Sequence, residues 1–184
     1  MKIAVAGGGA FGIKHLEGLA NIKDVEVVSL VGRRIEPTRE LAAKFKIKHT
    51  TIDLAETLAM KDLDAVILCT PTQMHAGQAM ACMKAGKHVF MEKPVATDAP
   101  GVRKVLEAAE EAKKKNLAVA VGLQRHHQAS YRETIKRLQD GAIGDLLAAR
   151  VYWNQYTPWV KKRAELEAAK KALGLGPLTE MEYQ

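Results

Sequence analysis

Short apolar runs alternate with amphipathic stretches from Met1 to about Val121. Ile3–Ala6 and Ala65–Thr70 contain no charged residue and end at turn residues, which is the pattern of strands buried on both faces. Strands that alternate with helices predict an α/β fold built on a parallel sheet. The remaining strands are predicted at Val25–Val31, Lys46–Thr50, His88–Met91 and Leu117–Val121.

The ends of the intervening helices are marked by residues suited to caps. Asp53 and Asp98 favour N-cap positions, because a side-chain oxygen can accept a hydrogen bond from the first free amides of a helix. Gly86 suits the C′ position that ends a helix. We therefore predict a Rossmann doubly wound parallel sheet with strand order 3-2-1-4-5-6 over residues 1–125.

Residues 126–184 are predicted to add a short strand and a helix to this domain. Ser130 and Glu133 have the spacing of a capping box for a helix that ends at Asp140-Gly141. Asp145–Tyr156 alternates as a strand does, and its unpaired edges favour a homo-oligomer through residues 145–184. Lys161–Leu173 reads as a solvated helix with opposite charges four residues apart. These pairs are Lys161–Glu165, Arg163–Glu167 and Glu167–Lys171.

Composition narrows the function classes. The net charge is +7 but aromatic residues make up only 5%, and the basic residues are spread along helices, so no nucleic-acid site is predicted. No segment approaches the roughly 20 apolar residues of a membrane span, and the N-terminus lacks the features of a secretory signal. Cys69 and Cys82 lack metal or redox spacing, and the adjacent His126 and His127 would point to opposite sides of a strand. We expect a cytoplasmic protein without a metal site.

The turn after the first strand has the spacing G-x-G-x-x-G. Gly7 permits a tight turn, Gly9 leaves the backbone open to a pyrophosphate, and Gly12 lets the next helix pack against the strand. A helix that begins near Ala10 and Phe11 would direct its free amides at the phosphates. We predict a dinucleotide site here, against the alternative of a glycine-rich turn that binds nothing.

The end of the second strand bears on the choice of cofactor. An NAD-binding domain carries an acid about 20 residues after the glycine turn, where it binds the ribose 2′-hydroxyl. Here that position is Gly32, followed by Arg33 and Arg34, whose guanidinium groups suit a 2′-phosphate. The sequence therefore favours NADP and leaves NAD possible; the alternative is two surface arginines in a loop.

Three further turns follow carboxyl ends of predicted strands, where this fold binds ligands. Cys69, Thr70, Pro71 and His75 are candidates for cofactor contact after the fourth strand, although His75 also suits an ordinary first-turn helix residue. Gln124 follows the sixth strand and is a further candidate for cofactor contact.

Glu92-Lys93-Pro94 follows the fifth strand, and Pro94 keeps Lys93 out of the helical region. The lysine could hold the nicotinamide ribose, polarise a substrate oxygen or serve in proton transfer as a catalytic residue. The alternative is a surface lysine. Glu92 and Pro94 complete this candidate part of the cofactor site.

These motifs together resemble the Gfo/Idh/MocA family of oxidoreductases, which takes its name from glucose–fructose oxidoreductase, inositol dehydrogenase and rhizopine catabolism. The resemblance runs from Met1 to about Tyr156. It rests on the glycine turn, Cys69-Thr70-Pro71, His75, Ala85–Val89 and Glu92-Lys93-Pro94. It implies a Rossmann domain followed by an open sheet that binds substrate.

The resemblance also implies hydride transfer between a nicotinamide and a sugar, polyol or related hydroxyl or carbonyl compound. Lys93 then matches the family lysine that contacts substrate and nicotinamide ribose and assists proton movement. Most of the family's substrate sheet and its catalytic histidine have no counterpart in this sequence. A second hypothesis is therefore a truncated, reconstructed or designed cofactor-binding module without turnover of its own. A third is an interaction domain with a vestigial glycine loop.

Overall fold

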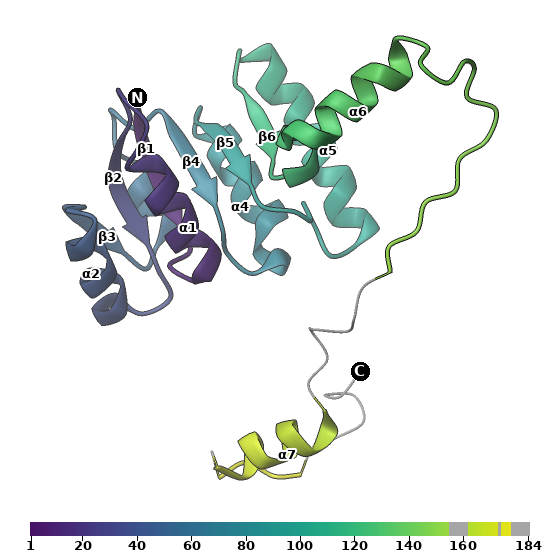
Figure 1. Ribbon diagram of the computed structural model, residues 1–184. Coiled ribbons are helices and arrows are strands. Elements are labelled where there is room, and N and C mark those ends of the chain that lie inside the picture. The colour runs from purple at the N-terminus through teal and green to yellow at the C-terminus, as the bar shows by residue number, and fades with distance from the viewer. Residues whose placement is uncertain (155–161, 173, 178–184) are drawn as a thin grey trace. The chain divides into compact units, whose positions relative to one another are not determined.

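Six parallel strands form the sheet at the centre of the computed structural model, which describes residues 1–154, 162–172 and 174–177 (Figure 1). Their order is β3-β2-β1-β4-β5-β6, and every neighbouring pair is parallel. The predicted doubly wound sheet is thereby confirmed. The strands are β1 (Lys2–Ala6), β2 (Glu26–Val31), β3 (His49–Thr51), β4 (Ala65–Leu68), β5 (His88–Met91) and β6 (Val119–Val121).

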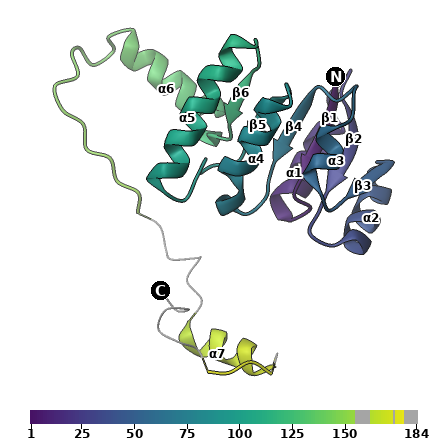
Figure 2. The same cartoon turned by 180° about the vertical axis from the view of Figure 1, so that it is seen from behind.

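Helices cover both faces of this sheet. α1 lies in front of it in Figure 1, and α4 and α5 lie in front when it is seen from behind in Figure 2. Connections of this kind follow from right-handed crossovers between parallel strands. The helices of this part are α1 (Ala10–Leu19), α2 (Ile35–Lys44), α3 (Leu54–Leu58), α4 (Thr72–Lys84) and α5 (Ala99–Lys114). The elements after β6 are a 3-10 turn (Gln124–His127), α6 (Ala129–Gln139) and α7 (Arg163–Ala172).

The central strands are apolar on both faces because two separate cores lie against them. Ile3 and Val5 of β1 pack with α1 and α2, whereas Ala4 and Ala6, which point the other way, pack with α4 and α5. This arrangement explains why the run Ile3–Ala6 contains no polar residue. A strand buried on both sides has no position at which a charge could reach water.

The predicted caps form as the sequence indicates. The Asp53 carboxylate accepts a hydrogen bond of 2.9 Å from the amide of Ala55, and Asp98 accepts one of 2.7 Å from the amide of Gly101. Gly86 has φ +72°, the left-handed conformation that glycine adopts most readily after a helix. Each cap satisfies backbone groups that a helix end otherwise leaves without partners.

The capping-box prediction is wrong. α6 already begins at Ala129, and the amide of Arg132 donates to the carbonyl of Gln128 at 3.1 Å, so Ser130 lies inside the helix. Its carbonyl accepts from the Thr134 hydroxyl at 2.8 Å instead. The helix therefore starts two residues earlier than Tyr131, where an N-cap at Ser130 would start it.

The predicted strand Asp145–Tyr156 does not form over Asp145–Asn154, and its last two residues lie outside the described part. Its apolar side chains are largely exposed, Leu147 at 94% and Val151 at 90%. A strand requires a neighbour to pair its amides and carbonyls, and none of the strands among the described residues offers one to this segment. The predicted homo-oligomer through residues 145–184 is not tested by this structure and stays a prediction.

The chain divides into two compact units, Met1–Lys136 and Arg137–Gln184. In the second unit, Arg163 donates to the Glu167 carboxylate at 3.0 Å, which confirms that predicted helix pair. Lys161 lies outside the described residues. Of the residues that the structure describes, no helix is both long and apolar enough to cross a membrane, and no group of three or more His, Cys, Asp or Glu side chains could hold a metal ion.

Replacing Leu68 by Ala tests the buried position of β4. Leu68 is 0% exposed, so the variant is expected to lose about 2–5 kcal/mol of unfolding free energy through lost burial and a residual cavity. The control is Leu106→Ala on α5, where the side chain is 61% exposed and the change should stay within about 0.5 kcal/mol. Urea unfolding followed by circular dichroism measures both, and equal losses would contradict the assigned core.

Candidate functional site

The turn between β1 and α1 is shaped by two positions that only glycine can occupy. Gly7 has φ +111°, and a Cβ atom there would lie 2.5 Å from the carbonyl oxygen of Cys69. A Cβ atom on Gly12 would lie 1.8 Å from the carbonyl oxygen of Gly7. The helix can therefore approach the end of the strand only because both side chains are missing, as the motif predicts.

Gly9 is the N-cap of α1, and unlike Gly7 and Gly12 it has no close neighbour. A Cβ atom at Gly9 would meet nothing within 4 Å, so open space lies over the backbone at this point. α1 has no side-chain cap and no acid in its first turn, which begins with Ala10 and Phe11. Uncapped first-turn amides and the positive end of the helix dipole favour an anion here.

A pocket of about 490 Å³ opens beside this turn. It brings Gly8 and Gly9 together with Arg33 and Arg34, which lie between β2 and α2. Both arginines are exposed, and no ion pair engages either guanidinium within the described part of the chain. The lining contains two cations and no carboxylate, which suits an anionic ligand. Its residues are Gly8, Gly9, Gly32, Arg33, Arg34, Pro37, Thr38 and Leu41.

Cys69 and Thr70 form the turn after β4, directly against the glycine turn. The amide of Cys69 donates to the carbonyl of Ala6 at 2.7 Å, and its own carbonyl faces Gly7. The Thr70 hydroxyl donates to the side-chain oxygen of Gln78 on α4. Burial raises the pKa of the Cys69 thiol to about 12, with a smaller contribution from the nearby carboxylate of Glu92. The thiol therefore stays protonated at neutral pH.

His75 lies in the first turn of α4, as one of the two hypotheses made from the sequence expects, and its contact with a cofactor stays a prediction. Its side chain is 1% exposed, and its ring nitrogens lie 2.7 Å from the carbonyl oxygen of Thr70 and 2.8 Å from that of Pro94. Carbonyl oxygens only accept, so both bonds form together only when both nitrogens carry a proton. The ring therefore lies between the turn after β4 and the turn after β5 and contacts both.

In the turn after β5, the side chain of Glu92 contacts α1, whereas that of Lys93 is exposed. The Glu92 carboxylate lies 2.8 Å from Nε2 of His15 on α1, and both side chains are mostly buried. Lys93 is exposed, and no hydrogen bond engages its ammonium group in the part of the chain that the structure describes. Gln124 begins the 3-10 turn after β6. His15 was missed at the level of sequence, because a helical histidine gives no sign of its partner 77 residues away.

The candidate residues therefore fall into two connected groups. The glycine turn, Cys69, Thr70 and Pro71 adjoin one another at the carboxyl ends of β1 and β4, and the two arginines share a pocket with the glycine turn. Glu92, Lys93 and Pro94 are joined to them through His15 and His75. Ligands of doubly wound sheets bind at this edge, where the strand order reverses between β1 and β4.

Comparison with known proteins identifies the family. A family model described as an oxidoreductase family with an NAD-binding Rossmann fold matches residues 1–122. The chain belongs to the Gfo/Idh/MocA family. The family assignment made from the motifs is therefore confirmed.

Its relatives in this family are longer dehydrogenases. The chain is 48% identical over 143 residues to 4-carboxy-2-hydroxymuconate-6-semialdehyde dehydrogenase of Sphingobium sp., covering 78% of this chain and 44% of the relative. It is 31% identical over 144 residues to myo-inositol 2-dehydrogenase of Thermotoga maritima, covering 78% and 42%. The chain thus spans less than half the length of these relatives.

Solved structures of the family share the fold. The apo scyllo-inositol dehydrogenase of Lactobacillus casei matches with a TM-score of 0.74 and 26% identity, over 79% of this chain and 43% of that one. The 3-ketoreductase KijD10 of Actinomadura kijaniata, solved with NADP, matches with a TM-score of 0.68 and 25% identity, over 79% and 45%. A further Lactobacillus casei structure, at 25% identity, holds NAD(H) and scyllo-inositol.

Gly12→Ala tests the close approach of α1 to the strand end. The new methyl group would collide with the Gly7 carbonyl, so we expect a loss of at least about 2 kcal/mol of unfolding free energy, in the range of other overpacking changes. Gly18→Ala is the matched control, because it lies in the same helix with nothing within 4 Å. It should gain up to about 1 kcal/mol, since alanine favours helix more than glycine does. Thermal unfolding measures the stability of both variants. A Gly12→Ala variant more stable than Gly18→Ala would contradict this geometry.

Proposed function

We propose that this chain is the nucleotide-binding part of an oxidoreductase of this family and that it prefers NADP to NAD. The observation that carries the preference is the pocket in which Arg33 and Arg34 face the glycine turn with no carboxylate in the lining. A 2′-phosphate carries a charge that two guanidinium groups can bind through forked hydrogen bonds. The position that holds an acid in NAD-binding domains is Gly32, which has no group to bind a 2′-hydroxyl.

The related structures support either cofactor, so the preference has to come from this chain's own residues. One structural relative holds NAD(H) and another holds NADP. The charge of the whole chain, +7, favours an anionic dinucleotide without distinguishing the two. Arg33 and Arg34 can supply this preference, because a guanidinium group binds a charged phosphate more strongly than a neutral hydroxyl.

The proposed chemistry is hydride transfer to or from a sugar, a polyol or a related hydroxyl or carbonyl compound. A bound nicotinamide supplies the hydride or accepts it. Lys93 is the proposed catalytic residue, because its exposed ammonium lies at the carboxyl end of β5, in the turn that His75 links to the end of β4. Its Nζ can donate a hydrogen bond to a substrate oxygen and exchange a proton with it during the transfer.

The second candidate function is a cofactor-binding module without turnover of its own. The observation that favours it is that α7 is the one regular element described after α6, so the described residues provide no second sheet for a substrate. The two functions share the dinucleotide site and differ only in turnover. Inositols and related polyols are the substrates to test first, because several relatives are inositol dehydrogenases.

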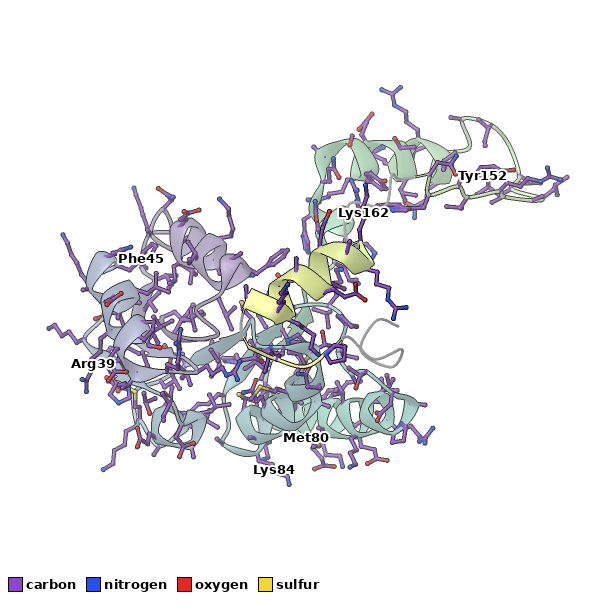
Figure 3. The ribbon with its side chains drawn as sticks, turned by 90° about the horizontal axis from the view of Figure 1, so that it is seen from below. Arg39, Phe45, Met80, Lys84, Tyr152 and Lys162 are labelled. Atoms are coloured by element: carbon purple, nitrogen blue, oxygen red, sulfur yellow. The ribbon has the colours of Figure 1, made fainter. Side chains whose placement is uncertain are left out.

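The double variant Arg33→Ala/Arg34→Ala tests the cofactor preference. Hydrogen bonds to charged groups contribute about 1.5–3 kcal/mol each, so NADPH affinity should fall at least tenfold, while NADH affinity should change less than threefold. Arg39→Ala is the control, because Arg39 lies exposed on α2 outside the pocket lining and carries the same charge (Figure 3).

Isothermal titration of each protein with NADPH and NADH at fixed ionic strength gives the four affinities. Equal losses for the two cofactors would contradict the 2′-phosphate assignment. A wild type that binds neither dinucleotide would contradict the proposed function as a whole and leave the glycine turn without a ligand.

Lys93→Ala tests the catalytic assignment. The variant should retain cofactor affinity within about threefold and lose at least a hundredfold in turnover of any active polyol, as expected for a general acid–base group. Lys104→Ala, an exposed lysine on α5, is the matched control and should behave as the wild type. Turnover is followed by absorbance of the reduced nicotinamide, and an unchanged rate would remove Lys93 from the mechanism. Absence of turnover with any polyol in the wild type, with intact NADPH binding, would favour the second candidate function.

A further inference from the structure

The space where a side chain at position 32 would stand is already filled by Thr38. A Cβ atom on Gly32 would lie 1.8 Å from Oγ1 of Thr38, 2.9 Å from its Cβ and 3.1 Å from its Cγ2. Gly32 does not adopt the left-handed conformation, so its backbone alone would accept any residue. The obstacle to a side chain at this position is therefore the threonine.

Thr38 cannot easily turn away from this position. Its side chain lies in the first half of α2 and is buried, with the residue 5% exposed. Its hydroxyl donates to the carbonyl oxygen of Arg34 at 2.6 Å, which fixes the rotamer that points Oγ1 toward Gly32. Any other rotamer would give up this hydrogen bond.

Gly32 is also held by a backbone hydrogen bond. Its amide donates to the carbonyl oxygen of Thr51 on β3 at 3.0 Å, which continues the pairing of β2 with β3. A displacement of Gly32 would disturb this bond. Both partners of the close contact are thus anchored to the backbone of the fold.

We propose that Thr38 is a specificity-determining residue that excludes an acidic side chain from position 32 and braces the turn that carries Arg33 and Arg34. This inference rests on the proposed preference for NADP. A carboxylate at position 32 is the group that would bind a ribose 2′-hydroxyl and repel a 2′-phosphate. Thr38 prevents this group from being accommodated, and its bond to Arg34 holds the arginine turn against α2.

The cofactor choice is therefore encoded by two residues that depend on each other. Gly32→Asp alone places a side chain into Thr38 and disturbs the turn. Thr38→Ala removes the contacts at 1.8 Å and 3.1 Å and leaves the one at 2.9 Å between the two Cβ atoms, which still requires the start of α2 to shift away from position 32. The pair of substitutions is required to move the preference toward NAD.

A double-mutant cycle in stability tests the steric part. Gly32→Ala, Thr38→Ala and the double variant are unfolded in urea beside the wild type. Adding the free-energy changes of the two single variants predicts a folding equilibrium constant for the double variant. We expect the measured constant to exceed this prediction at least tenfold. Additive effects would overturn the proposed contact.

Cofactor titrations test the specificity part, with Gly32→Asp/Thr38→Ala as the variant and Gly32→Asp/Thr38→Ser as the matched control. Serine keeps the hydroxyl oxygen that lies 1.8 Å from the missing Cβ atom, so the control should remain destabilised. The Asp/Ala variant should shift the ratio of NADH to NADPH affinity toward NADH by more than tenfold relative to the wild type. An unchanged ratio, or an equal shift in both double variants, would overturn the role of Thr38.

The two levels of the hypothesis fail in different ways. A wild type that binds neither NADPH nor NADH would overturn the proposed function and the specificity role together. The stability cycle would still report on the contact between Gly32 and Thr38, because unfolding requires no cofactor. A wild type that binds NADPH tightly, combined with an additive cycle, would overturn only the role of Thr38.

Discussion

The structure depends on one close approach of backbone to backbone, between the turn after β1 and the turn after β4. Gly7 faces the carbonyl of Cys69, and Gly12 lies against the carbonyl of Gly7, at separations that no side chain permits. This contact lets α1 begin directly above the strand end and directs its amides toward the edge of the sheet where the strand order reverses. Because the pocket with Arg33 and Arg34 is lined by the same glycine turn, its shape follows from that approach.

Much of the fold could be predicted because its signals are local. The run Ile3–Ala6, the caps at Asp53 and Asp98 and the glycine spacing each report on neighbouring residues, and the sheet order follows from how such units connect. The strand expected at Asp145–Tyr156 does not form over its described residues, because alternation describes a strand's faces and says nothing about a partner to pair with.

The site was harder to predict where its residues act through distant partners. Arg33 and Arg34 could be found because their position after the glycine turn is a matter of spacing. The pairing of His15 with Glu92 and the contact between Gly32 and Thr38 join different elements. The sequence left His75 open between a cofactor contact and an ordinary residue of a first helical turn, since nothing in its neighbours shows that two carbonyl oxygens converge on it. Such relations appear only once the sheet has brought its strand ends together.

The bridge made by His75 has a mechanical consequence. A single buried ring lies within hydrogen-bond distance of carbonyl oxygens in the turns after β4 and β5, so the two turns form one wall packed on a shared side chain. A dinucleotide that meets such a wall finds its shape already set and loses little free energy to ordering the protein. Any ligand that pushed Thr70 outward would carry Pro94, and with it the backbone of Lys93, in the same direction. Affinity and the alignment of the lysine would then change together.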